Sequence, residues 1–151
     1  GVGFSLALAS DLVVASDTAR FGLVFKKVGL APDGGMAYFM THAVGARRAR
    51  ELMLSARLFD TKEAQSLGLV AEVVDDARLD ARAMELAEEM ASSATFALAM
   101  GKRMFHAAAR PSLEEFLELE SHIQTEVLQT QDHREGVAAY REKRKPLFHG
   151  R

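Results

Sequence analysis

The chain contains no cysteine and no tryptophan, and only three of its 151 residues are proline. The absence of cysteine excludes disulfide bonds, a thiolate nucleophile and a cysteine-ligated metal site. It agrees with a reducing compartment, so we expect a cytoplasmic protein. The sequence also lacks an apolar run near the roughly 20 residues of a membrane-spanning helix, and it opens without the basic segment of a signal peptide. We therefore expect no membrane partner.

Charge of either sign is not in strong excess, because 19 Lys and Arg residues stand against 21 Asp and Glu residues. A formal net charge of −2 gives no general attraction to nucleic acid, which is therefore not expected as a partner. No metal site is predicted either, since the histidines are scattered without the spacing of metal ligands. They are His42, His106, His122, His133 and His149.

The sequence has no initiator methionine and begins within a glycine turn, Gly1-Val2-Gly3. We therefore expect further residues upstream of Gly1. Residues 1–75 alternate between short apolar segments and turns, whereas residues 76–151 read as amphipathic helices. Those helices have few partners within the chain, which indicates that they pack on another part of the protein or on a neighbouring subunit.

Apolar spacing and turn residues predict the individual elements. Residues 36–54 have helical spacing that Gly45 interrupts, and they follow a turn at Pro32-Asp33-Gly34-Gly35. Further helices are predicted over residues 4–9, between Asp60 and Gly68, and over residues 76–91, 95–109, 112 onward and 132–145. Strands are predicted over residues 12–15, 20–25 and 69–74.

Polar residues at the expected helix starts have the spacing of capping signals. Gly68 and Pro146 are expected where two of the helices end. The capping residues are Asp60 with Glu63, Ser112 with Glu115, and either Asp75 or Asp76.

Five motifs follow one another along the chain. They are Gly1-x-Gly3-x-x-Leu6-Ala7-x-x-x-Asp11, Ala19-Arg20-Phe21-Gly22, Val28-Gly29-Leu30-x-Pro32-x-x-Gly35 with Gly45 and Ala49-x-Glu51-Leu52, Glu63-Ala64-x-x-x-Gly68-Leu69-Val70, and Asp132-x-x-Glu135-Gly136-x-x-Ala139-Tyr140-x-x-Lys143-Arg144-x-Pro146-x-Phe148. Each motif is weak alone. In this order and spacing they resemble the crotonase family, the enoyl-CoA hydratases and isomerases, over essentially the whole chain.

The resemblance implies an α/β fold, the ClpP/crotonase-like spiral of ββα repeats. Residues 1–75 would form the C-terminal part of that spiral, and residues 76–151 a helical region that builds a homotrimer or a dimer of trimers. The missing N-terminal half of the same domain, about a hundred residues, would precede Gly1. The implied substrate is an acyl-CoA thioester, with coenzyme A as part of the substrate and no permanently bound cofactor.

The family's common step is stabilisation of an enolate-like thioester oxyanion by two backbone N–H groups, aided by a helix N-terminus. The turn Gly1-Val2-Gly3, which opens a predicted helix, suits that task. The resemblance assigns one N–H donor to Val2 and a substrate contact to Gly3, with the second donor upstream. The alternative is an ordinary glycine turn before a helix.

Hydratases of the family carry two glutamates where this chain has Ser5 and Phe25. Hydration of an enoyl thioester needs two carboxylates that hold and activate one water. Neither Ser5 nor Phe25 can exchange a proton usefully at neutral pH, so ordinary hydratase activity is not expected. By resemblance, both positions remain candidates for substrate contact.

Asp33 stands where the family's double-bond isomerases carry an acid. A 1,3-proton shift needs one base, which removes a proton at C2 and returns it at C4. An apolar pocket that includes Val24, Phe25 and Phe39 would raise the pKa of the carboxyl group toward the working range. We therefore expect an enoyl-CoA isomerase with Asp33 as acid and base. The alternative is a plain turn residue, which Pro-Asp-Gly-Gly also favours.

Two further functions stay open. The family's aromatic acyl-CoA dehalogenases use the same aspartate position as a nucleophile, and residues 28–30 and 47–54 resemble that branch. That branch has a Trp where Phe25 stands, which weakens this hypothesis. The second alternative is a non-catalytic crotonase-like subunit that serves assembly or CoA binding. It remains a hypothesis because both glutamates of the hydratases are absent.

The segment from Tyr140 to Lys145 is basic and carries an aromatic residue. In the family this region reaches the adenine and phosphate end of coenzyme A, often across a subunit boundary. The resemblance implies that Tyr140 stacks on adenine and that Lys143 meets a phosphate. The alternative is a solvated helix end whose basic residues favour the helix dipole.

Overall fold

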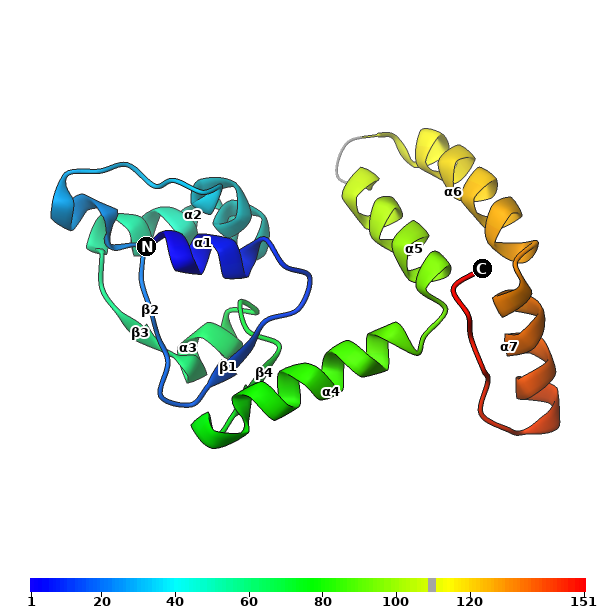
Figure 1. Ribbon diagram of the computed structural model, residues 1–151. Coiled ribbons are helices and arrows are strands. Elements are labelled where there is room, and N and C mark those ends of the chain that lie inside the picture. Colours follow the sequence, from blue (N-terminus) through cyan, green and yellow to red (C-terminus); the bar gives the residue numbers. More distant parts are fainter. Residues whose placement is uncertain (109–110) are drawn as a thin grey trace. The chain divides into compact units, whose positions relative to one another are not determined.

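The computed structural model describes residues 1–108 and 111–151. They form two compact units, residues 1–84 and 85–151, and the boundary falls within helix α4 (Leu79–Ala91) (Figure 1). The predicted boundary at residue 75 precedes that helix, and the assignment of residues 76–151 to oligomerisation stays a prediction. Among the described residues, no helix combines the length and the apolar composition needed to cross a bilayer.

The first unit mixes short strands with helices, as the sequence predicts. Strands β1 and β4 pair in parallel with Val14 opposite Glu72, while β2 and β3 pair antiparallel with Phe21 opposite Phe59. In chain order its elements are α1 (Val2–Leu8), β1 (Val14–Ser16), β2 (Arg20–Phe21), the 3₁₀ helix η1 (Val24–Val28), α2 (Met36–Ser55), β3 (Phe59–Asp60), α3 (Thr61–Ser66), β4 (Glu72–Val74) and the 3₁₀ helix η2 (Asp76–Arg78).

Three aromatic rings form the centre of the core in this unit. Phe4 on α1 lies 5.0 Å from Phe21 on β2, and Phe21 lies 5.8 Å from Phe59 on β3, measured between ring centroids. Helix α2 adds Met40 and Leu52, which are fully buried. Burial of each such side chain contributes about 1.5–3 kcal/mol. The core therefore fixes α1 against both strands and α2.

The interruption of α2 at Gly45 confirms the prediction of two consecutive helical segments. Gly45 has φ 77° and ψ 154°, values outside the helical region that glycine adopts far more readily than other residues. The helix ends with Ala56 in the left-handed conformation at φ 48°.

The predicted strand over residues 20–25 is wrong beyond β2. After Gly22 the chain enters η1, which ends at Gly29 with φ 73°. A Cβ on Gly22 would lie 2.8 Å from a methyl carbon of Leu58, so the chain passes close to the segment before β3 at this point. The apolar Phe25, which suggested a strand, is buried from η1 instead.

The other strands are shorter than predicted. Strand pairing covers only three residues each in β1 and β4. Leu69 and Val70 are buried ahead of β4, and the Ala71 N–H donates to the Val13 carbonyl at 2.9 Å. Strand β3, with two residues, was not predicted.

Helix α3 begins as expected at Asp60, whose carboxylate accepts a hydrogen bond from the Glu63 N–H at 2.9 Å. The predicted capping box is not completed, because the Glu63 carboxylate binds the Arg57 guanidinium, with one N···O distance of 2.8 Å. This hydrogen bond lowers the pKa of Glu63. Gly68 follows the helix with φ 72°, in the predicted left-handed conformation.

The predicted cap at Asp75 or Asp76 takes a different form. Asp75 precedes η2 without a side-chain cap bond, and α4 starts only at Leu79. The Asp76 carboxylate accepts a hydrogen bond from the Ser16 hydroxyl at 2.6 Å. Asp76 therefore ties η2 to the end of β1.

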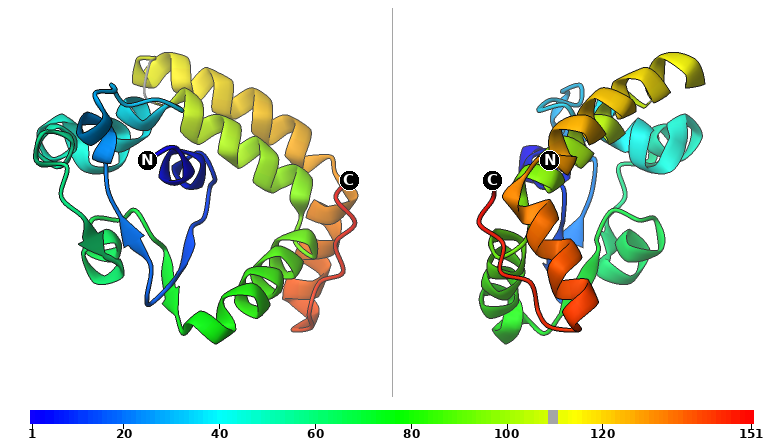
Figure 2. Two further views of the ribbon diagram at one scale, coloured as in Figure 1. Left: turned by 60° about the vertical axis from the view of Figure 1, so that its left-hand side comes forward. Right: turned by 90° about the vertical axis from the view of Figure 1, so that its right-hand side faces the viewer.

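The second unit consists of helices and a C-terminal segment, residues 143–151, that runs back along α7 (Figure 2). Helices α5 and α6 lie side by side in antiparallel directions, with Ile123 buried. Besides the end of α4, the helices are α5 (Thr95–Ala107), α6 (Leu113–Leu128) and α7 (Gln131–Glu142).

The capping box of α6 is confirmed. The Glu115 N–H donates to the Ser112 hydroxyl at 3.3 Å, and the Ser112 N–H donates to the Glu115 carboxylate at 2.8 Å. The predicted end of α5 at Ala109 lies outside the described residues. Helix α7 ends before the predicted Lys145, because Lys143 turns the chain with φ 56°.

The buried position of Leu52 predicts a large cost of truncation. We expect Leu52→Ala to lower the free energy of unfolding by about 2–5 kcal/mol, through lost burial and the cavity left behind. Leu54→Ala is the matched control, since Leu54 is on the same helix and 64% exposed. Urea unfolding of the protein that contains this chain measures both. Equal effects of the two substitutions would contradict this description of the core.

Candidate active site

The first turn of α1 includes the N–H groups of Val2 and Gly3, for which the described residues supply no hydrogen-bond acceptor. Gly1 precedes the helix, and its carbonyl accepts hydrogen bonds from the N–H groups of Phe4 and Ser5 at 2.9 and 3.3 Å. The N–H groups of Val2 and Gly3 lie in the first turn, where a helix offers no acceptor and has its positive end. A Cβ on Gly3 would meet no described atom within 4 Å apart from its chain neighbours and the backbone of its own helix. The role of the Val2 N–H as an oxyanion donor stays a prediction.

The predicted turn before α2 is present and is built on two glycines. Gly34 has φ 57° and Gly35 has φ 78°, and the Met36 N–H donates to the Asp33 carbonyl at 3.0 Å. Two successive positive φ values are typical of a type I′ turn, which glycine adopts without steric cost. The turn places Asp33 three residues before Met36, the first residue of α2.

This turn lies directly against the first turn of α1. The Ser5 hydroxyl donates to the Asp33 carbonyl at 3.0 Å. A Cβ on Gly34 would lie 3.0 Å from the Ser5 Cβ and 3.3 Å from a methyl carbon of Val2. The structure thus brings the backbone of Asp33, predicted as a site residue from the third motif, next to Val2 and Ser5, which were predicted from the first motif.

Two expectations about the surroundings of Asp33 need correction. The Asp33 residue is exposed, so the described residues do not form the expected apolar pocket around it. Val24 and Phe39 are only half-buried, and the Phe39 ring packs against Gly35. Phe25 is 6% exposed within the core, so its side chain does not face an open site among the described residues.

Ser5 also differs from the predicted substrate contact. Its exposed fraction is 0%, and its hydroxyl is engaged by the Asp33 carbonyl. A substrate could reach it only if the turn moved. Sequence reasoning missed this role because nothing local in the motif indicates a partner 28 residues away.

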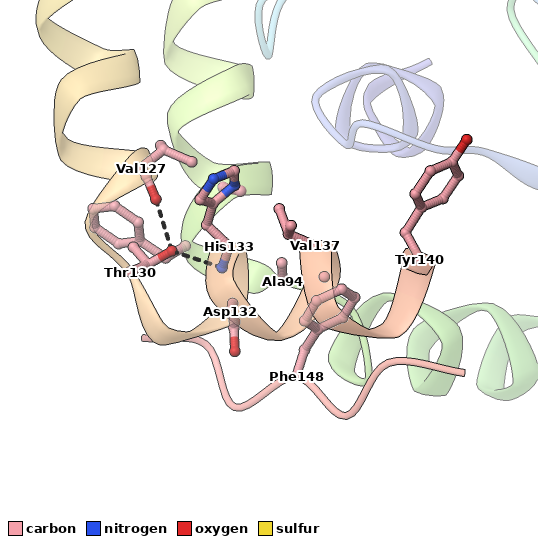
Figure 3. A pocket seen from close by; sticks show the side chains of 11 residues that line it. Ala94, Val127, Thr130, Asp132, His133, Val137, Tyr140 and Phe148 are labelled. Atoms are coloured by element: carbon pink, nitrogen blue, oxygen red, sulfur yellow. Dashed lines mark hydrogen bonds between the residues drawn. The ribbon is translucent and has the colours of Figure 1, made fainter. Parts of the chain in front are cut away.

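Tyr140 and Lys143, the predicted contacts for the CoA end, lie in the second unit. Tyr140 is 87% exposed, and Lys143 is exposed at the end of α7. Tyr140 also borders a pocket of about 370 Å³ that is lined mainly by apolar side chains (Figure 3). These include Phe96, Val127, Val137 and Phe148. Contacts of Tyr140 with adenine and of Lys143 with phosphate stay predictions.

A buried carboxylate on α7 holds the end of the chain next to this pocket. Asp132 is 3% exposed and accepts hydrogen bonds from the N–H groups of His149 and Gly150 at 2.7 and 2.8 Å. The Asp132 N–H donates in turn to the Arg151 carbonyl at 3.0 Å. Asp132 belongs to the fifth family motif. The motif did not predict its hydrogen-bond partners, because His149 and Gly150 lie 17 and 18 residues further along the chain.

Glu135 provides a second anchor for the same segment. Its carboxylate pairs with the Arg144 guanidinium, with one N···O distance of 2.9 Å, and accepts a hydrogen bond from the Leu147 N–H at 2.8 Å. The hydrogen bond from Arg144 is the main cause that lowers the pKa of Glu135, and the hydrogen bond from the Leu147 N–H adds to it. Together they lower this pKa to about 2. The backbone that follows Lys143 is therefore fixed by charge on α7.

Comparison with known proteins identifies a family and related sequences. The sequence matches the Enoyl-CoA hydratase/isomerase family over residues 1–151. It is 36% identical to the 1,2-epoxyphenylacetyl-CoA isomerase of Escherichia coli K12 over 151 residues, which is 100% of this chain and 58% of that protein. It is 34% identical to the human mitochondrial methylglutaconyl-CoA hydratase over 154 residues, which is 99% of this chain and 45% of that protein.

Solved structures give the same assignment. The crystal structure of an enoyl-CoA hydratase/isomerase from Cupriavidus metallidurans CH34 matches with a TM-score of 0.91 and 39% identity, covering 99% of this chain and 57% of that one. An enoyl-CoA hydratase from Bacillus anthracis matches with a TM-score of 0.91 and 32% identity, covering 99% and 58%. The fold is therefore the predicted crotonase fold, present in part.

The chain belongs to the enoyl-CoA hydratase/isomerase family. It spans less than three fifths of the length of the curated relatives named above. Those relatives include both an isomerase and a hydratase, at 36% and 34% identity.

The lowered pKa of Glu135 predicts an acid-dependent loss of anchoring. A carboxylate whose pKa is about 2 in the folded protein and near 4.5 when unfolded stabilises the fold fully above pH 4.5. That contribution is lost as the pH falls from 4.5 toward 2. We expect Glu135→Gln to remove this part of the acid dependence, and Glu118→Gln, on exposed α6 surface, to leave it unchanged.

NMR titration of the Glu135 carboxyl carbon measures the pKa directly, and thermal unfolding as a function of pH measures the linked stability. A Glu135 titration midpoint near the ordinary value would show that the ion pair with Arg144 does not form in solution.

Proposed function

We propose that the protein containing this chain is an enoyl-CoA double-bond isomerase that acts on acyl-CoA thioesters. Asp33 is its single acid and base, and the Val2 N–H is one donor to the thioester oxygen. The observation that carries the proposal is the contact between the Asp33 turn and the start of α1, where the Ser5 hydroxyl and the Asp33 carbonyl are 3.0 Å apart. This contact supports the proposal, because it puts the backbone of the proposed acid beside the helix turn that carries the proposed donor.

The reaction is a 1,3-proton shift. The Asp33 carboxylate removes a proton from C2 of a 3-enoyl thioester, and the electron pair moves toward the thioester oxygen. The Val2 N–H and a second donor from outside this chain stabilise that oxygen, each contributing about 3 kcal/mol to the transition state. The Asp33 carboxyl then returns the proton at C4, the double bond moves from C3–C4 to C2–C3, and the carboxylate is restored.

The side chains at positions 5 and 25 favour this reaction over hydration. Hydration requires two carboxylates around a water, and these positions hold a serine and a phenylalanine. Ser5 is fully buried and Phe25 is 6% exposed, so both are occupied with packing in the first unit. Asp33 is then the acid available beside the helix start for a one-base mechanism.

Tyr140 and Lys143 are proposed to bind the adenine and phosphate end of coenzyme A in a homotrimer or a dimer of trimers. Their exposure supports this role, because a ligand can reach both side chains. Exposed apolar residues of the second unit support the assembly, since contact with a neighbouring subunit would bury them. They include Met90, Leu98, Phe105, Leu113 and Leu117.

Replacement of the proposed acid tests this function. We expect Asp33→Asn in the full protein to lower the rate of 3-enoyl-CoA isomerisation by about 10²–10⁴-fold, because the amide cannot carry the proton. Asp17→Asn makes the same charge change at an exposed turn of the first unit and should leave the rate unchanged. Formation of the conjugated 2-enoyl thioester is followed by its ultraviolet absorbance. Unchanged turnover in Asp33→Asn would defeat the proposal.

The exposed carboxyl of Asp33 also favours a second candidate, an aromatic acyl-CoA dehalogenase with Asp33 as nucleophile. In that reaction the carboxylate displaces halide from the ring and an aryl ester forms at Asp33, which water then hydrolyses. Mass spectrometry after rapid quench with a halogenated aromatic acyl-CoA tests it. We expect no ester on Asp33. An adduct there would replace the isomerase proposal, and CoA binding without any turnover would indicate a non-catalytic subunit.

A further inference from the structure

We propose that Ser5 is a positioning residue, whose buried hydroxyl holds Asp33 in register with the N–H groups at the start of α1. The inference rests on the proposed function, which supplies the roles of Asp33 and Val2. Ser5 is 0% exposed, and its hydroxyl donates to the Asp33 carbonyl at 3.0 Å. Its side chain acts on the turn and does not touch the substrate.

The Asp33 carbonyl joins three parts of the site. It accepts the Ser5 hydroxyl from α1 and the Met36 N–H from the first residue of α2, both at 3.0 Å. One oxygen atom therefore links the oxyanion helix, the turn and α2. A shift of α1 relative to this turn must break or lengthen the bond from Ser5.

The turn needs such an anchor because its two central residues are glycines. Gly34 and Gly35 have φ values of 57° and 78°, and glycine has wide conformational freedom on both sides of φ zero. The local sequence therefore resists other conformations only weakly. The close approach of Gly34 to Ser5, with 3.0 Å from an ideal Cβ to the Ser5 Cβ, limits movement toward α1. The hydrogen bond limits movement away from it.

The expected consequence is kinetic. A displacement of an acid by about 1 Å from its productive position can lower the rate of a chemical step by roughly 10²-fold. Loss of the Ser5 hydroxyl leaves the Met36 N–H bond in place, so a smaller displacement is expected. The effect should appear in kcat and not in KM, because Ser5 makes no contact with the acyl chain or with coenzyme A.

The experiment compares Ser5→Ala and Ser5→Thr with Ser10→Ala in the full protein. Threonine keeps a hydroxyl at position 5. Ser10, just beyond α1, has a hydroxyl that donates to the Ala7 carbonyl and is exposed, so its loss is a matched control. For Ser5→Ala we expect kcat for 3-enoyl-CoA isomerisation to fall about 10-fold with KM changed by less than about twofold. Hydrogen exchange at the Met36 amide should become faster. Ser5→Thr should restore both, and Ser10→Ala should match the wild type.

Wild-type kcat and unchanged Met36 exchange in Ser5→Ala would overturn the proposal. The proposal would also be overturned if Ser5→Ala and Ser5→Thr lowered kcat equally and lowered the unfolding midpoint equally. That result would show that Ser5 contributes only packing. Failure of the proposed function is separate, since full turnover in Asp33→Asn signals it directly. In that case faster Met36 exchange in Ser5→Ala still supports the anchor, and unchanged exchange rejects it.

Discussion

The close contact between the start of α1 and the turn at Asp33 determines how the first unit is organised around its candidate site. It requires glycine at position 34 for two reasons. The residue has φ 57°, and an added Cβ would lie 3.0 Å from the Ser5 Cβ, closer than neighbouring carbon atoms normally pack. The turn leads directly into Met36, which is fully buried and begins α2. The backbone at Asp33 is thus fixed on one side by α1 and on the other by the core.

Helix α1 depends in turn on the aromatic core beneath it. With seven residues, it is far shorter than the roughly 12–15 residues that an isolated helix needs to be even marginally stable in water. Its position comes from tertiary packing, chiefly Phe4 against Phe21 and Phe59. The open N–H groups at its first turn and the buried ring of Phe4 are therefore parts of one arrangement. The packing of Phe4 therefore fixes where the first-turn N–H groups lie, without help from their own side chains.

Local sequence signals predicted many of the individual elements, but they did not predict contacts between residues that are distant in the sequence. The kink at Gly45, the capping box at Ser112 and the left-handed Gly68 follow from chemistry within a few residues. The apolar residues up to Phe25 suggested a strand because a strand and a core-facing 3₁₀ turn have the same composition over so short a stretch. The bond from Ser5 to Asp33 spans 28 residues, and no local pattern reports it. For the same reason the sequence predicted Asp33 as a site residue but did not predict its surroundings. Among the described residues, Asp33 is exposed.

The serine at position 5 and the acid at position 33 form a coupled pair within the proposed mechanism. A glutamate at position 5 would introduce a longer, ionisable side chain where Ser5 is now fully buried. Burial of an unpaired carboxylate is costly, so the Asp33 turn would have to move away and admit water to it. The contact therefore favours a small side chain at position 5, where the Ser5 hydroxyl meets the Asp33 carbonyl at 3.0 Å. Within the proposed mechanism, the serine at position 5 both removes the carboxylate that hydration would need and holds the Asp33 turn against the helix that carries Val2, the proposed oxyanion donor.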